Sequence, residues 1–146
     1  MDRAGEAVEC MKSGYLCSQA VLSTFSEQLG LDKITAKKIS CAFGAGVSRL
    51  GLTCGAVSGA FMVIGLKYGK TVASDNDSKE KTYLLTQKFV EKFTERNGTI
   101  NCKELLGFYL GKPEEYSQAR DKGLFISFCT KLVRDASEIL EEIIKE

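Results

Sequence analysis

The sequence predicts an all-α single domain, a bundle of six to eight helices around a central, glycine-interrupted apolar helix. Apolar residues recur at helical spacing along most of the chain, and no segment alternates like a strand for long. The stretch 54–68 is apolar all round, as expected of a helix in the middle of a bundle. A length of 146 residues suits one domain, and we find no domain boundary and no repeat.

The first half of the chain contains the signals of four helices. They are expected over 2–12, closed by Ser13-Gly14; over 16–29, stopped by Gly30; over 32–43, capped by Asp32; and over 54–68, after a glycine-rich connection at 44–53. In the third of these helices, we expect Ile34 and Ile39 to face the core and Lys37 and Lys38 to face the solvent.

The second half begins with a polar loop at 69–78 and continues with an amphipathic helix over 79–96. Its expected apolar stripe contains Tyr83, Leu84, Phe89, Val90 and Phe93. Asn101 begins a short helix with an Asn-x-x-Glu pattern typical of a capping box, and Pro113 begins another. A long helix over 123–145 ends the chain, with Phe125, Phe128, Leu132, Val133, Ala136, Ile139, Leu140 and Ile143 on its buried side.

Charge and hydropathy argue against nucleic-acid binding and against membrane insertion. Twenty basic and nineteen acidic residues give a net charge of +1, and no basic block stands out. The first six residues lack the apolar core of a signal peptide. The longest apolar run, 54–66, is shorter than the roughly 20 residues that span a bilayer. We therefore expect a cytoplasmic protein.

Two residue counts restrict the chemistry further. The chain has no histidine, which excludes a Ser-His-Asp or Cys-His catalytic arrangement and a Cys/His zinc site within one chain. It has six cysteines, which are reduced at rest in the cytoplasm, so a metal or redox role outranks a structural disulfide framework. No CxxC pair is present, which argues against a zinc knuckle or a thioredoxin-type motif.

Cys54 stands at the start of the central apolar helix, with Thr53 as the expected N-cap. Free backbone N–H groups and the helix dipole stabilise a thiolate in a first turn, which predicts a lowered pKa for this thiol. Arg49, on the preceding connection, adds to the effect. Gly51, Gly55 and Gly59 recur every four residues, so another helix or a ligand can approach the backbone closely. The alternative interpretation is a buried cysteine in a tightly packed helix pair.

The other five cysteines divide into two groups. Cys102 follows the Asn101 cap and precedes Lys103, and Cys17 stands near the start of its helix, so three of the six thiols fall at expected helix starts. Cys129 lies in a helix interior, where packing is the usual role. Cys10 and Cys41 have no helix-start context, and we interpret them as core or surface filler.

Four ordered blocks of sequence carry a family resemblance. They are "CSQAVLSTF" (17–25), "GAGVSRLGLTCGAVSGAFMVIGLKYG" (44–69), "CKELLG" (102–107) and "FCTKLVRDASEIL" (128–140). Together they resemble the redox-active protein family C_GCAxxG_C_C, which is marked by four cysteines and a CGAxxG motif, here Cys54 to Gly59. The resemblance covers nearly the whole chain, 1–146. It implies that Cys17, Cys54, Cys102 and Cys129 are the family cysteines. Together with the helix-start placement of three of these thiols, it leads us to expect that all four lie close together in the bundle.

Three hypotheses follow for the function, and whether the chain is an enzyme stays open. The first is thiol/disulfide or electron-transfer chemistry by Cys17, Cys54, Cys102 and Cys129, with Cys54 as the attacking thiolate and an unidentified redox partner. The second is a zinc ion or an iron–sulfur cluster held by the same four thiolates, although closely spaced ligand pairs are missing. The third is a non-enzymatic helical interaction protein, which could form a homodimer through its last helix.

Overall fold

The computed structural model describes residues 1–145, and in this range it contains eight right-handed α-helices and no strand. The all-α prediction is therefore confirmed. The helices are α1 (Arg3–Lys12), α2 (Cys17–Ser26), α3 (Lys33–Ser40), α5 (Gly55–Tyr68), α6 (Asn76–Asn97), α7 (Cys102–Leu106), α8 (Pro113–Asp121) and α9 (Leu124–Ile143). Two 3-10 turns, η1 (Glu27–Leu29) and η2 (Cys41–Phe43), and the segment α4 (Gly44–Ser48) complete the described chain.

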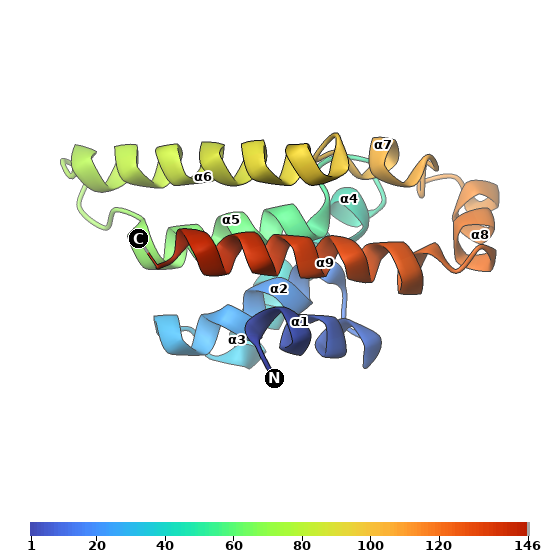
Figure 1. Cartoon of the computed structure of the whole chain (residues 1–146), viewed down its shortest axis with the longest axis horizontal. Helices are drawn as coiled ribbons and strands as arrows, with labels where there is room; N and C mark the ends of the chain where they lie inside the picture. Colours follow the sequence, from blue (N-terminus) through green and yellow to red (C-terminus); the bar gives the residue numbers. More distant parts are fainter. Residues whose placement is uncertain (146) are drawn as a thin grey trace.

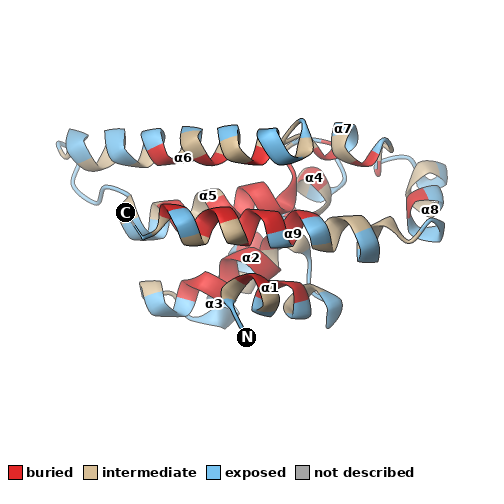
Figure 2. Cartoon of the chain, in the orientation of Figure 1, coloured by how far each residue is buried: buried red, intermediate tan, exposed pale blue. Residues whose placement is uncertain are grey.

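Helix α5 forms the centre of the bundle, as its uniformly apolar sequence predicts. It is packed against α2, α6 and α9, and Figure 2 shows its ribbon largely buried. Gly59 lets α2 approach closely, because a Cβ at this position would lie 2.9 Å from the carbonyl oxygen of Ser18. The expected small-residue contact between two helices is thus present at Gly55 and Gly59, whereas Gly51 lies outside the helix.

The helices around α5 are arranged on two sides of it (Figure 1). The long helices α6 and α9 run side by side across the molecule, and α1, α2 and α3 lie on the other side of α9 in this view. The short helices α7 and α8 gather at one end, where the chain turns back into α9. The first residues of α2, α5 and α7 line one cavity, which residues of α8 and of the start of α9 also line.

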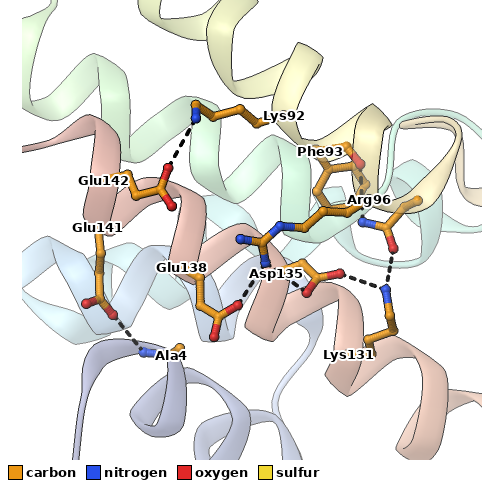
Figure 3. Close-up of polar contacts among 10 residues, drawn as sticks. Ala4, Lys92, Phe93, Arg96, Lys131, Asp135, Glu138, Glu141 and Glu142 are labelled. Atoms are coloured by element: carbon orange, nitrogen blue, oxygen red, sulfur yellow. Dashed lines mark hydrogen bonds and ion pairs between the residues drawn. The ribbon is translucent and has the colours of Figure 1, made fainter.

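Helices α6 and α9 are joined by a polar network (Figure 3). Arg96 of α6 contacts Asp135 at 3.2 Å and Glu138 at 2.8 Å on α9, and Lys131 donates a hydrogen bond of 2.8 Å to the buried Asp135. Lys131 also donates to the side chain of Asn97. Because Asp135 is removed from water but paired with two cations, the network holds the two helices in one register.

The local helix signals are confirmed where a single side chain defines the helix start. Asp2, Asp32 and Asn101 each accept a hydrogen bond from a backbone N–H in the first turn, and Pro113 opens α8. The Asn101 cap makes only the forward half of the expected capping box, from the N–H of Glu104.

The buried faces of two helices differ from the prediction. Ile34 and Ile39 are exposed, at 72% and 51%, and the small residues Ala36 and Ser40 face the core instead. Helix α3 lies so close to α2 that the hydroxyl of Ser18 reaches the carbonyl of Ser40, which leaves no room for isoleucine.

In α6, Tyr83 and Leu84 are likewise exposed, and the buried stripe consists of Leu85, Phe89 and Phe93. The three residues are spaced four apart and form one line toward α5 and α9, whereas Tyr83 and Leu84 lie off that line.

No helix within residues 1–145 combines the length and the apolarity that crossing a membrane would require.

Candidate functional site: a four-cysteine cavity

A cavity of about 800 Å³ lies at the end of the bundle where the helix starts meet, and Cys17, Cys54, Cys102 and Cys129 all line it. Cys17 is the first residue of α2, Cys54 precedes α5, Cys102 is the first residue of α7, and Cys129 lies within α9. Four segments far apart in the sequence therefore contribute one thiol each. A cavity of this size is typical of small-molecule sites.

Backbone pairing places Cys54 beside Cys102. The N–H of Cys54 donates to the carbonyl of Ile100 at 2.8 Å, and the N–H of Cys102 donates to the carbonyl of Leu52 at 2.7 Å. Thr53 and Asn101, the residues directly before the two cysteines, form an isolated antiparallel bridge. Thr53 and Asn101 do not bond to each other directly, and the Cα atoms of a non-hydrogen-bonded antiparallel pair are about 4.5 Å apart. The starts of α5 and α7 are therefore held next to each other.

The sulfur of Cys17 fills the space that the missing side chain of Gly55 leaves open. A Cβ at Gly55 would lie 2.5 Å from Sγ of Cys17 and 3.0 Å from the carbonyl oxygen of Phe43. Only glycine therefore fits between this sulfur and the start of α5. Cys17 thus lies against the residue that directly follows Cys54.

The wall beside these thiols is a left-handed turn in α4. Ala45, Val47, Ser48 and Arg49 have φ values between 53° and 71°, and Gly46, between them, has a φ of 64°. The left-handed conformation costs about 1–2 kcal/mol for each residue with a Cβ, so the surroundings must stabilise it. The hydroxyl of Ser48 donates to the carbonyl of Ala42, and the N–H of Arg49 donates to the carbonyl of Ala45.

Gly46 permits the contact between this turn and Cys102. A Cβ at Gly46 would lie 2.5 Å from the Cβ of Cys102 and 3.1 Å from its Sγ. Glycine is needed here for two reasons, the positive φ and the close approach. The glycine-rich connection expected at 44–53 therefore forms part of the cavity wall.

The environment of Cys54 differs from the prediction in two respects. Cys54 is itself the N-cap of α5, without a side-chain hydrogen bond, and Thr53 belongs to the bridge instead of capping the helix. The pKa of Cys54 lies well above the usual value, because burial opposes the thiolate and a Cys17 thiolate repels it; the backbone N–H groups of Ala56 and Val57 only partly compensate. Cys54 is 4% exposed, so desolvation outweighs the helix start.

Burial also raises the pKa of the other three cavity thiols. It raises the pKa of Cys102 to about 11 and that of Cys129 to about 12, with repulsion by a Cys17 thiolate as the next cause in both. Burial raises the pKa of Cys17 too, but the backbone N–H groups of Ala45, Ser18 and Ala56 favour its thiolate. A charge on Cys17 in turn raises the pKa of Cys54, Cys102 and Cys129.

The two remaining cysteines lie in different places. Cys10 is half-buried, with its sulfur 3.9 Å from the hydroxyl of Ser23, whereas Cys41 is exposed and lines the outer part of the same cavity. All six cysteines are free thiols in this structure.

A known protein family matches most of this chain. The profile of the family described as "Putative redox-active protein (C_GCAxxG_C_C)" matches residues 15–143. The chain belongs to this family. The matched range includes all four cavity cysteines and Cys41, and it excludes Cys10. Searches of curated proteins and of solved structures found no match.

The arrangement of ligand side chains bears on the metal hypothesis for this C_GCAxxG_C_C protein. Among residues 1–145, no three cysteine, aspartate or glutamate side chains lie close enough together to hold a metal ion. The described geometry therefore gives no support to a zinc ion or an iron–sulfur cluster held by Cys17, Cys54, Cys102 and Cys129.

Two exposed residues that line this cavity, Cys41 and Lys12, are not marked as site residues by the sequence. The pattern indicates filler for Cys41 and a helix end for Lys12, yet both are exposed and line the cavity. No local signal marks either residue, because the rim forms where the ends of α1, η2 and α9 meet. The CGAxxG motif marks only Cys54 and Gly55 among the residues that line the cavity.

Proposed function

We propose that this C_GCAxxG_C_C protein performs thiol/disulfide redox chemistry in the four-cysteine cavity, with Cys17 and Cys54 as the reacting pair. The observation that carries the proposal is the contact of Sγ of Cys17 with Gly55, the residue directly after Cys54, where an added Cβ would lie 2.5 Å from this sulfur. Repulsion by the Cys17 thiolate is also the largest charge effect on Cys54, ahead of that of Cys102. Both facts are consistent with two sulfurs at the same helix start.

Cys17, and not Cys54, is the attacking thiol in this proposal. The nucleophile in disulfide exchange is the thiolate, so the thiol that loses its proton first attacks. Several backbone N–H groups favour the Cys17 thiolate, and the other three cavity thiols ionise against its charge. Cys54 then acts as the resolving thiol.

The reaction balances as a two-electron exchange with an organic disulfide. The Cys17 thiolate attacks one sulfur of the substrate, the substrate S–S bond breaks, and the released thiolate takes a proton from water. The Cys54 thiol then loses its proton to water and attacks Sγ of Cys17 in the mixed disulfide. The Cys17–Cys54 bond forms, the second substrate thiolate leaves and is protonated, and two protein thiols have been oxidised for one disulfide reduced.

The test uses a Cys10→Ser/Cys41→Ser protein, which retains the four cavity thiols. Incubation with an excess of an oxidised dithiol should lower the free-thiol count from four to two, and non-reducing peptide mapping should find Cys17 linked to Cys54. Cys17→Ser in this background should abolish the reaction with substrate disulfide. Cys54→Ser should stop it at the mixed disulfide on Cys17.

A matched control is Cys129→Ser, which removes a cavity thiol outside the proposed pair. It should leave the Cys17–Cys54 link intact. If the cavity thiols stay reduced at every potential, or if the link forms only between Cys102 and Cys129, the proposal is wrong.

A further inference from the structure

The rim of the four-cysteine cavity carries charge of one sign. Of the residues that line the cavity within the described chain, Lys12 and Arg49 are the charged ones, and both are cations. This is a local asymmetry, because the whole chain has almost as many acidic as basic residues. The starts of α2 and α5, which also face the cavity, add positive partial charge to the same surface.

We propose that the cavity binds a small organic disulfide that carries carboxylate groups, with Lys12 and Arg49 holding the carboxylates. This inference rests on the proposed thiol/disulfide chemistry and adds the substrate class to it. An anion gains from both cations and meets no opposing carboxylate on the cavity surface.

Arg49 is positioned for this role by the left-handed turn. Its guanidinium lies over the ring of Tyr116, 4.5 Å from the centroid, and Tyr116 lines the cavity as well. The N–H groups of a guanidinium point outward in its own plane, so a ring below its face leaves them free. A carboxylate at the edge of the guanidinium can then accept two parallel hydrogen bonds. Lys12 is 3.9 Å from Glu9 and largely solvated, so this weak pair leaves the ammonium accessible.

The depth of the thiols favours a small molecule over a protein disulfide. The attacking thiol, Cys17, is half-buried, and Cys54 and Cys102 are only 4% and 7% exposed, on the floor of a cavity of about 800 Å³. A disulfide in a folded protein is attached to two chain segments and cannot descend to this floor without unfolding locally. The walls between rim and floor include Leu106, Leu110, Phe125 and Leu132, which suits an organic body between the anionic groups and the sulfurs.

The experiment compares two small disulfides with the Cys10→Ser/Cys41→Ser protein at neutral pH. Dithiobis(nitrobenzoate) carries two carboxylates, and dithiodipyridine is neutral; each second-order rate constant is divided by that of the same reagent with the urea-unfolded protein. Arg49→Gln and Lys12→Gln should each lower the normalised rate of the anionic reagent about 2- to 5-fold, with little change for the neutral one. Arg49→Lys should restore most of the rate.

Arg134→Gln is the matched control, since it removes one exposed cation of α9 that does not line the cavity. It should change neither rate, and circular dichroism checks that every variant is folded. Equal loss with both reagents, or no loss in the Arg49 and Lys12 variants, overturns the substrate class while the thiol chemistry stands. If neither reagent oxidises the cavity thiols of the parent protein, the proposed function itself fails.

Discussion

Sγ of Cys17 lies against Gly55, so close that a Cβ on this glycine would be 2.5 Å from the sulfur. The contact joins the first residue of α2 to the first residue of α5. It explains why a glycine, which disfavours helix formation, opens the central helix of the bundle. The packing of α2 against α5 and the position of the Cys17 thiol therefore both depend on the missing Cβ of Gly55.

Gly55→Ala should destabilise the protein by about 1–3 kcal/mol, because the new methyl group must displace Sγ of Cys17 or the carbonyl of Phe43. Chemical denaturation measures the change. Gly65→Ala is the control on the same helix: nothing lies within 4 Å of its added Cβ, so it should be neutral or stabilising by up to about 1 kcal/mol. Equal effects of the two substitutions would contradict the close contact.

Cys17→Ser should lower the pKa of Cys102 from about 11 and that of Cys129 from about 12, since a Cys17 thiolate raises both. Burial remains, so neither pKa should return fully to the ordinary value. The measurement is the pH dependence of alkylation, read for each cysteine by peptide mass mapping. Cys10→Ser is the control and should leave both pKa values unchanged.

In the protein without these substitutions, the pH dependence of alkylation ranks the thiols by their pKa values. Cys17 should be alkylated at a lower pH than Cys54, whose pKa is raised more strongly. The opposite order would return Cys54 to the role of attacking thiol.

Asp135→Asn should destabilise the protein at neutral pH by about 1–3 kcal/mol, because Lys131 and Arg96 lose their charged partner. Burial alone would raise the pKa of Asp135, but hydrogen bonds from Lys131, Asn97 and Arg96 and the charge of Lys131 together lower it. The stabilisation is therefore present above the unfolded pKa of about 3.9 and is lost as the pH falls through the lower folded value.

Thermal unfolding of Asp135→Asn and the parent protein between neutral and acidic pH tests this sign. The difference between them should shrink toward acidic pH. Glu138→Gln, which removes a half-exposed contact of the same Arg96, should cost no more than about 1 kcal/mol. A difference that grows with acidity would contradict the assignment.

Under the proposed thiol/disulfide chemistry, anaerobically purified protein should contain less than one zinc or iron per chain, because the reaction needs free thiols at Cys17 and Cys54. Metal analysis combined with the absorbance spectrum measures this directly. A stoichiometric metal that is lost in Cys17→Ser and retained in Cys10→Ser would instead support the four-thiolate hypothesis.

The sequence by itself determined several of the helix starts and which helix is central. It missed the start of α6, which begins at Asn76 after the Asp75 cap and not at residue 79. The caps at Asp2, Asp32 and Asn101 act within three residues of themselves, so they could be found without knowing the fold. The apolar sequence of α5 likewise needs a buried position in any arrangement. The family resemblance was also available from the sequence, and the profile match over 15–143 confirms it.

Only the tertiary structure decided which faces are buried and how the thiols ionise. Ile34 and Tyr83 are exposed because neighbouring helices cover other sides of α3 and α6, and periodicity does not specify those neighbours. The helix start predicted a lowered pKa for Cys54, yet its pKa is raised. Capping is a local interaction between a few atoms, whereas desolvation sums over every atom around the sulfur, and those atoms come from segments that only the folded chain brings together.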